Sequence, residues 1–257
     1  MEVRAKKALG QHFLTDQKVA RAIVDALHGG LPVLEVGPGM GVLTQYLLQR
    51  EDIDLRLIEL DSESVEYLLT HFAGMQGRLM EGDFLQLKLE KIFPGRFALI
   101  GNFPYNISSQ ILFKVYENRN QIPEVVGMFQ KEVAERVAAK PGSKTYGILS
   151  VLLTAFYDIE YLFTVHEHVF NPPPKVKSAV IRLRRNQVVT LACDEALFTK
   201  VVKIGFNQRR KTLRNALKQL NMDLAAVPED LLAKRAEQLS VEDFVAITNS
   251  VKETANN

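Results

Sequence analysis

The sequence predicts an α/β fold in two parts: a doubly wound parallel sheet followed by a small all-helical domain. Up to about Asn186, short apolar runs alternate with segments of helical period, a pattern typical of a sheet covered by helices. One apolar run leads directly into a glycine loop, Gly37–Gly41, a junction typical of Rossmann-like sheets. Beyond residue 186 only helical patterns continue. We therefore expect one domain over residues 1–186 and a second over residues 187–257.

The expected elements follow from the length and period of each apolar segment. The first helix is expected from Asp16 to about His28, because its apolar residues share one face and Gly29-Gly30 follow it. The expected strands cover residues 32–36, 55–60, 79–80, 97–101, 125–129, 159–164 and 179–183. Further helices are expected over residues 42–47, 62–72, 146–157, 195–205, 210–220, 228–234 and 241–251. Pro172-Pro173-Pro174 predicts an extended loop, because proline is excluded from helix interiors.

The composition narrows the classes of protein to consider. With 47% hydrophobic residues, the chain of 257 residues is expected to bury a sizeable core. The single cysteine, Cys193, predicts a reducing cytoplasm, because it has no second cysteine to pair with. No apolar run approaches the roughly 20 residues that cross a bilayer, so no membrane segment is expected. Nothing in the sequence points to an obligate oligomer, so we expect a monomer.

The charges are unevenly distributed, although the net charge is only +2. Between Glu167 and Asp194 there are five Lys and Arg residues and no acid, and between Glu195 and Asp223 there are seven, again without an acid. A single run of this kind is often just a solvated helix face. Two adjacent runs favour a positive surface that binds a polyanion.

The glycine loop and two strand-end acids predict a site for an adenosine-containing ligand. Gly37, Gly39 and Gly41 allow a tight turn and close approach of the ligand to the backbone. The dinucleotide fingerprint requires a further glycine where this chain has Val42, which argues against nicotinamide and flavin cofactors.

The two acids follow successive expected strands. Glu59 ends the second strand, where a carboxylate accepts hydrogen bonds from ribose hydroxyls. Asp83 ends the third, placed to accept a hydrogen bond from an adenine amino group. An isolated acid at such a position is more often a helix cap, but the combination with the glycine loop favours a ligand site.

The tetrapeptide Asn102-Phe103-Pro104-Tyr105 follows the fourth expected strand and indicates the chemistry. An adenine N6 is a poor nucleophile because its lone pair is delocalised into the ring. The Asn102 side-chain oxygen and a backbone carbonyl at Phe103 or Pro104 would accept both N6 protons and raise its reactivity. Pro104 stiffens the loop, and Tyr105 offers an aromatic face for an extruded base. Together with the adenosine site, this predicts methyl transfer from S-adenosyl-L-methionine to adenine N6, with no metal required.

At these residues the sequence resembles the ribosomal RNA adenine dimethylase family, over nearly its whole length. Gly10–Leu14 is similar to the family's element over the methionine end of the cofactor, which implies contacts from Gln11, His12 and Leu14. The resemblance assigns the glycine loop, Glu59, Asp83 and Asn102 to the cofactor as well. The tetrapeptide matches Asn-Leu-Pro-Tyr with Phe103 in place of leucine, a change that keeps an apolar side chain where the backbone carbonyl matters.

Two later motifs resemble one branch of that family. Phe170–Val180 is similar to the loop whose aromatic residue stacks on the target base, which makes Phe170 a candidate clamp. Phe206–Asn215 is similar to the signature of the small-subunit enzymes. This resemblance implies N6,N6-dimethylation of two adjacent adenosines in a hairpin near the 3′ end of 16S rRNA, on an immature small ribosomal subunit.

The same C-terminal region suits RNA on physical grounds. We expect its basic cluster to bind RNA phosphates in a salt-dependent way; the cluster consists of Arg209, Arg210, Lys211, Arg214 and Lys218. The histidines other than His12 lack the spacing of metal ligands.

Three other functions are compatible with parts of the sequence. A 23S rRNA adenine N6-methyltransferase shares the sheet, the tetrapeptide and the cofactor, but Phe206–Asn215 argues against it. A ribosome-assembly factor that only binds RNA is a second alternative, against which the intact Gln11–Leu14, glycine loop and Asn102 argue. A nicotinamide oxidoreductase is disfavoured by Val42.

Overall fold

The computed structural model describes residues 3–220 and 222–253, which form two compact units. The first unit comprises the residues up to Ala134 together with Ile159–Arg185. The second comprises Glu135–Asp158 together with the residues from Asn186 onward. The sequence predicts a single boundary at residue 186, which leaves residues 135–158 with the sheet. The hydrophobic pattern of residues 135–158 does not show which part of the chain they pack against. The helix in this segment is buried against helices that come more than 40 positions later in the sequence.

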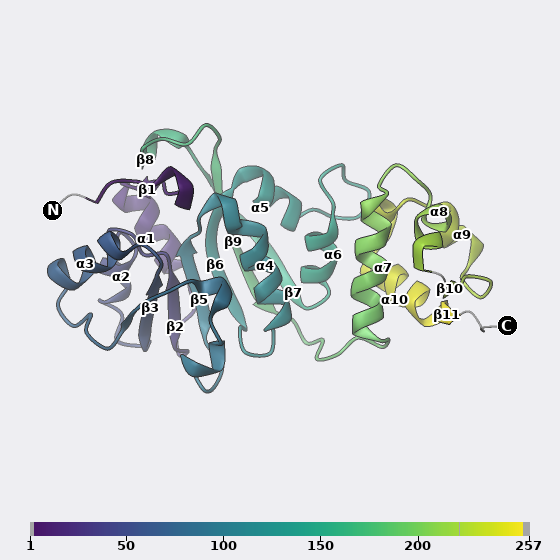
Figure 1. Ribbon diagram of the computed structural model, residues 1–257, viewed down its shortest axis with the longest axis horizontal. Coiled ribbons are helices and arrows are strands. Elements are labelled where there is room, and N and C mark those ends of the chain that lie inside the picture. The colour runs from purple at the N-terminus through teal and green to yellow at the C-terminus, as the bar shows by residue number, and fades with distance from the viewer. Residues whose placement is uncertain (1–2, 221, 254–257) are drawn as a thin grey trace. The chain divides into compact units, whose positions relative to one another are not determined.

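The centre of the first unit is a sheet of seven strands (Figure 1). In spatial order they are β4 (Leu79–Glu81), β3 (Leu55–Glu59), β2 (Val33–Val36), β5 (Ala98–Asn102), β6 (Glu124–Gln130), β9 (Ser178–Arg185) and β7 (Tyr157–Val165). The pairs from β4 to β6 are parallel, and β6 pairs with β9 antiparallel. β2 lies between β3 and β5, so the chain order reverses there, and ligands bind outside the carboxyl ends of strands at such a point.

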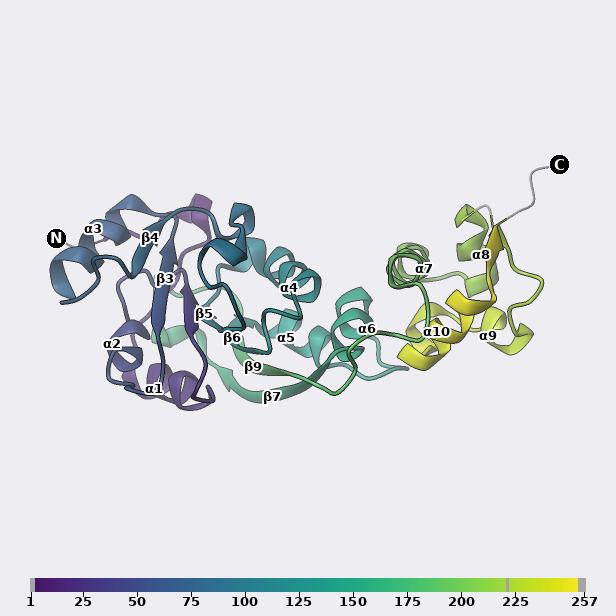
Figure 2. The same cartoon turned by 90° about the horizontal axis from the view of Figure 1, so that it is seen from below.

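Helices cover both faces of this sheet, with α1 and α2 on one face and α4 on the other (Figure 2). The helices of this part of the chain are α1 (Gln17–Asp25), α2 (Thr44–Leu47), α3 (Ser62–His71), α4 (Ser108–Glu117) and α5 (Lys131–Val137). α1 begins after Asp16, whose carboxylate accepts the N–H groups of Lys18 and Val19 at 2.8 and 3.0 Å. Its apolar face, including the fully buried Ala20 and Ile23, packs into the core on the sheet.

The N-terminal segment is joined to a loop that lies far away in the sequence. A short 3₁₀ turn, Lys7–Leu9, precedes β1 (Phe13–Leu14), which pairs antiparallel with β8 (Phe170–Asn171). In this register Leu14 lies opposite Phe170, and both side chains are buried. This pairing holds the N-terminal segment at the edge of the first unit (Figure 1).

The second unit is helical apart from one two-stranded ladder. Its elements are α6 (Ile148–Thr154), α7 (Glu195–Asn207), α8 (Leu213–Leu217), α9 (Glu229–Ala233), α10 (Val241–Ser250) and the antiparallel strands β10 (Met222–Asp223) and β11 (Lys252–Glu253). Phe198, Leu213 and Phe244 are fully buried among them. The helix expected over 210–220 begins only at Leu213, because residues 208–211 form a turn and Thr212 has an extended backbone.

The loop after β5 rests on an aromatic side chain that two glycines accommodate. Gly101 of β5 and Gly127 of β6 are register partners. The ring of Phe103, which is 1% exposed, lies against both glycines and has its centroid 4.9 Å from that of Phe129. A side chain at Gly127 would overlap the Phe103 ring. The close packing of the Phe103 ring against the sheet therefore fixes the backbone of residues 102–105.

We expect Gly127→Ala to lower the free energy of unfolding by about 1–3 kcal/mol, because the added methyl group overpacks the site of the Phe103 ring. Urea denaturation measures this change. Gly95→Ala is the matched control, since a Cβ at Gly95 meets no atom within 4 Å. Equal stabilities of the two variants would contradict the role of Gly127.

Candidate functional site

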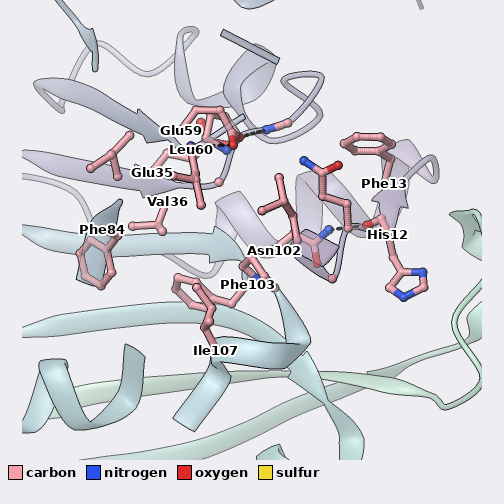
Figure 3. A pocket seen from close by; sticks show the side chains of 18 of the residues that line it. His12, Phe13, Glu35, Val36, Glu59, Leu60, Phe84, Asn102, Phe103 and Ile107 are labelled. Atoms are coloured by element: carbon pink, nitrogen blue, oxygen red, sulfur yellow. Dashed lines mark hydrogen bonds between the residues drawn. The ribbon is translucent and has the colours of Figure 1, made fainter. Parts of the chain in front are cut away.

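A pocket lies at the carboxyl ends of β2, β3, β4 and β5, where the sheet order reverses (Figure 3). Its lining residues are Leu9–Leu14, Glu35–Met40, Val42, Leu43, Ile58–Leu60, Gly82–Phe84 and Asn102–Ile107. The structure thus brings together most of the predicted site residues: Gln11, His12, Leu14, Gly37, Gly39, Glu59, Asp83, Asn102, Pro104 and Tyr105. Gly41 and Phe170 do not line this pocket.

The glycine loop follows β2 directly and turns because its glycines adopt positive φ. The φ angles of Gly37, Gly39 and Gly41 are 67°, 56° and 79°, values that side chains disfavour. A Cβ at Gly39 would lie 2.9 Å from Cε1 of Phe13, so the loop approaches the N-terminal segment closely. Gly41 instead packs against Phe72 after α3, which explains why it is absent from the pocket lining.

Glu59 ends β3 and fixes the glycine loop to that strand. Its carboxylate is 5% exposed and accepts three backbone N–H groups: from Leu60 at 2.8 Å, Asp61 at 2.9 Å and Gly39 at 2.9 Å. Burial raises the pKa of Glu59, and these hydrogen bonds act in the opposite direction. The arrangement orients the acid at the pocket wall (Figure 3).

Asp83 follows β4 and begins a 3₁₀ turn, Phe84–Gln86. One carboxylate oxygen accepts the N–H of Leu85 at 2.8 Å, and within residues 3–220 and 222–253 the other has no hydrogen bond. Lys114 of α4 steadies this turn by donating to the carbonyls of Leu85 and Leu87 at 2.9 and 2.7 Å. Its ammonium also lies 5.3 Å from the centroid of the Phe84 ring. The free oxygen of Asp83 thus has a fixed position.

Glu35 is a pocket residue to which the sequence analysis gives no separate role. It lies in the otherwise apolar β2, is 1% exposed, and accepts the hydroxyl of Thr44 at 2.7 Å. Burial raises its pKa to about 8, and the nearby charge of Glu59 acts in the same direction. The sequence does contain a sign of this role, because Glu35 is the one acid in an apolar strand. Burying a carboxylate costs free energy unless it is neutral or paired, so an acid at such a position is expected to have a specific function.

Asn102 ends β5, and its side chain bridges to the N-terminal segment. Nδ2 donates to the backbone carbonyl of His12 at 3.0 Å (Figure 3). A carbonyl partner requires the amide nitrogen on that side, which assigns the opposite position to Oδ1. Oδ1 lies at the pocket and has no hydrogen bond from the described part of the chain. It is therefore an acceptor available to a ligand.

The backbone carbonyls of Phe103 and Pro104 differ in whether they are free to accept a hydrogen bond from a ligand. The Pro104 carbonyl accepts the N–H of Ile107 at 3.3 Å and the hydroxyl of Ser108 at 3.2 Å, where α4 begins. The N–H of Phe103 donates to the carbonyl of Met128 at 3.1 Å, so that residue is tied to β6. Among residues 3–220 and 222–253, no group donates a hydrogen bond to the Phe103 carbonyl.

Tyr105 and His12 form the rim of the site. Their rings stack with centroids 5.3 Å apart, and the Tyr105 hydroxyl forms a short hydrogen bond with the hydroxyl of Ser178. Nδ1 of His12 donates to the Pro172 carbonyl at 2.8 Å, which requires the proton on that nitrogen. The imidazole is turned away from Asn102 and Glu59 (Figure 3).

Phe170 is part of the core in this structure. Its side chain is 4% exposed and packs beside Leu14 across the β1–β8 pair. Its role as a clamp on the target base stays a prediction, and it requires the ring to leave this packing.

The predicted RNA-binding cluster lies in the second unit and divides into two groups. Arg209 forms an ion pair with Glu237 at 2.7 Å, and Arg214 pairs with Glu229. Arg210, Lys211 and Lys218 are exposed, and no acid described by the structure pairs with them. Arg210 and Lys211 lie in the turn before α8, where the sequence analysis expects a helix.

Two further observations concern the described part of the chain. No group of three or more His, Cys, Asp or Glu side chains there is placed to hold a metal ion. No helix within residues 3–220 and 222–253 has both the length and the apolar character needed to cross a membrane.

Comparison with known proteins agrees with this geometry. The sequence matches the family model for ribosomal RNA adenine dimethylase over residues 2–253. It is 62% identical to Ribosomal RNA small subunit methyltransferase A of Cytophaga hutchinsonii, covering 96% of this chain and 97% of that protein. It is 60% identical to the protein of the same name from Parabacteroides distasonis, covering 96% and 93%.

Solved structures show the same fold. A dimethyladenosine transferase from Plasmodium falciparum has a TM-score of 0.75 and 26% identity, covering 92% of this chain and 96% of that one. The 23S rRNA methyltransferase ErmE has a TM-score of 0.68 and 26% identity, covering 92% and 99%. The chain belongs to the ribosomal RNA adenine dimethylase family. This confirms three predictions: the α/β fold with a doubly wound sheet, the activity of an rRNA adenine dimethyltransferase, and S-adenosyl-L-methionine as the methyl donor.

We expect the stability of the protein to fall between about pH 5 and pH 8 because of Glu35. Its folded-state pKa of about 8 lies above the ordinary value of 4.5, so in this interval the folded state holds a proton that the unfolded chain has released. This group lowers the free energy of unfolding by up to about 1.4 kcal/mol per pH unit as pH rises. Glu35→Gln is expected to remove the contribution of this group to the pH dependence of the free energy of unfolding.

Urea denaturation from pH 5 to pH 8.5 measures this effect. Glu66→Gln, on the exposed face of α3, is the matched control and keeps the wild-type profile. An undiminished slope in Glu35→Gln would show that Glu35 is already ionised in the folded protein.

Proposed function

We propose that this chain transfers methyl groups from S-adenosyl-L-methionine to N6 of two adjacent adenosines, in a hairpin near the 3′ end of 16S rRNA. Its substrate is an immature small ribosomal subunit, and it acts as a monomer in the cytoplasm. The observation that carries the proposal is the orientation of Asn102, whose Oδ1 is left free at the pocket by the bond from Nδ2 to His12. The names of the 62% and 60% identical relatives support the small subunit as substrate. The lone cysteine suits a reducing compartment.

The residues around the pocket fit the proposed methyl donor. Positive-φ glycines leave positions 37 and 39 of the loop without side chains, so a ligand can approach the backbone closely there. Glu59 offers a carboxylate for the ribose hydroxyls, and the unpaired oxygen of Asp83 suits an adenine amino group. Leu14 and Phe13 give the N-terminal wall an apolar character. The two carboxylates and the apolar wall together match the ribose and the adenine of an adenosine moiety.

The chemistry that the protein itself supplies concerns the target nitrogen. Oδ1 of Asn102 and the Phe103 carbonyl accept the two N6 protons of the target adenine, which concentrates electron density on that nitrogen. Phe103 is preferred to Pro104 for the second acceptor, since the Pro104 carbonyl already accepts hydrogen bonds from Ile107 and Ser108. The tight packing of the Phe103 ring fixes that carbonyl.

The remaining roles are binding and alignment. When bound, S-adenosyl-L-methionine supplies a methyl group activated by its positive sulfonium. Tyr105 gives the extruded adenine a stacking face, and its hydroxyl is held by Ser178. N6 becomes acidic once methylated and loses its proton to water, so no side chain is assigned as a general base. Alignment of the two substrates is the main contribution of the site.

We expect Asn102→Ala to reduce methylation of small subunits by about 10²–10³-fold, because one of two acceptors for N6 is lost. Transfer of labelled methyl groups to small subunits that lack the modification, followed by nucleoside analysis, measures this. Asn120→Ala, an exposed position of the same unit, is the matched control.

The product distinguishes the candidate functions. N6,N6-dimethyladenosine confined to small-subunit RNA supports the proposal. Label in large-subunit RNA would make the chain a 23S rRNA methyltransferase, and binding of small subunits without transfer would make it an assembly factor.

We propose that the unpaired members of the basic cluster contact RNA phosphates. Arg210→Ala and Lys211→Ala are each expected to weaken binding to small subunits and to reduce the salt dependence of log K by about one counterion per residue. Filter binding at several salt concentrations measures both quantities. Lys88→Ala, an exposed lysine of the first unit, serves as the control. A salt slope identical to that of the wild type would exclude these residues from the phosphate contacts.

A further inference from the structure

The N-terminal strap, residues Lys6–Leu14, forms one wall of the pocket. Its residues from Leu9 onward line the cavity, and Phe13 lies close to Gly39 of the glycine loop. Its carboxyl end is held by the β1–β8 pair and by the bond from Asn102 to the His12 carbonyl. A ligand in this pocket therefore lies against the strap.

The amino end of the strap is fastened to a single buried carboxylate, Asp61, which follows β3 and caps α3. The side chain of Asp61 is 1% exposed. Oδ1 accepts the Lys6 ammonium at 2.5 Å, and Oδ2 accepts the Gln11 amide at 3.1 Å. The Lys6 ammonium also lies 3.0 Å from a carboxylate oxygen of Glu63. Two side chains of the strap therefore meet on one acid.

The side-chain amide of Gln11 forms two hydrogen bonds within the protein. Its Nε2 donates to Asp61, and its Oε1 accepts the backbone N–H of Lys6 at 2.8 Å. The 3₁₀ turn at Lys7–Leu9 closes a loop between these two residues. The amide of Gln11 therefore holds the strap in shape and ties it to Asp61.

Asp61 is also joined to the pocket itself. Its backbone N–H donates to the Glu59 carboxylate, which accepts Gly39 of the glycine loop on its other oxygen. One connected set of hydrogen bonds thus runs from the strap through Asp61 and Glu59 to the glycine loop. Although burial alone would raise the pKa of Asp61, the bonds from Lys6, Gln11 and Ser64 together lower it, which keeps the acid charged.

We propose that Asp61 is a positioning residue that latches the N-terminal strap over the cofactor pocket and slows release of the cofactor, with Lys6 and Gln11 as the strap's two attachment points. This inference rests on the proposed function only in naming the pocket's ligand as S-adenosyl-L-methionine. It assigns Gln11 to the latch, where the family resemblance implies a cofactor contact.

The test uses Asp61→Asn in the full chain. Asparagine still accepts hydrogen bonds at the start of α3, so the helix cap is retained while the charge is lost. Hydrogen exchange of the cofactor-free protein is the first readout. We expect peptides that cover residues 6–14 to exchange about tenfold faster in the variant, as loss of charge-assisted hydrogen bonds predicts, with α3 unchanged.

The second readout is the dissociation rate of labelled S-adenosyl-L-methionine, expected to rise about tenfold in Asp61→Asn and in Lys6→Met. Lys7→Met is the matched control, because the neighbouring Lys7 side chain is exposed and forms no ion pair with the described residues. Unchanged exchange of the strap in Asp61→Asn would overturn the latch. So would equal dissociation rates for Lys6→Met and Lys7→Met.

The two proposals fail in different ways. If the wild-type chain binds no S-adenosyl-L-methionine, the proposed function fails, and hydrogen exchange in the cofactor-free protein still decides whether Asp61 holds the strap. If binding and methylation are normal but the strap exchanges equally fast in all variants, the latch fails and the function stands.

Discussion

The carboxylate of Glu59 is the interaction on which the rest of the site depends. It is buried, and it uses both oxygens to accept backbone N–H groups, two from the turn after β3 and one from Gly39. A single side chain thus joins the ends of two neighbouring strands. Gly39 in turn packs against Phe13, and Asp61 binds Lys6 and Gln11. The glycine loop, the turn after β3 and the N-terminal segment are therefore one connected structure around the pocket.

The tetrapeptide after β5 shows how a backbone carbonyl becomes a dependable acceptor. Its position is set by the ring of Phe103, which packs against two glycines that face each other across β5 and β6. Phenylalanine in place of the family's leucine thus fills space that the strands themselves provide. The Asn102 amide is oriented by a bond to the N-terminal segment, so the same segment that lines the pocket also sets the direction of the Asn102 oxygen.

The sequence predicts most strands of the sheet well because they are runs of buried apolar residues, and the seven strands of the sheet end within about two residues of their expected positions. It also predicts the pocket residues that follow strand ends, since the carboxyl ends of parallel strands converge. It does not show which side chains satisfy one another. Gln11 is predicted as a ligand contact and lines the pocket, but the bonds of its amide to Asp61 and Lys6 could not be read from the sequence. Phe170 is predicted at the target base, but β1–β8 pairing buries it.

Ion pairs also divide the basic cluster into residues that are neutralised by an acid and residues that are not. From the sequence, all its members are equivalent, because a stretch without acids gives no local partner for any of them. In the folded chain, Glu229 and Glu237 come from later positions to pair with Arg214 and Arg209. A phosphate that binds either arginine must replace a carboxylate, so the net gain is smaller than at an exposed residue that pairs with no acid. We therefore expect the attraction for RNA to be concentrated at Arg210, Lys211 and Lys218, while ion pairs tie Arg209 and Arg214 to Glu237 and Glu229 within the second unit.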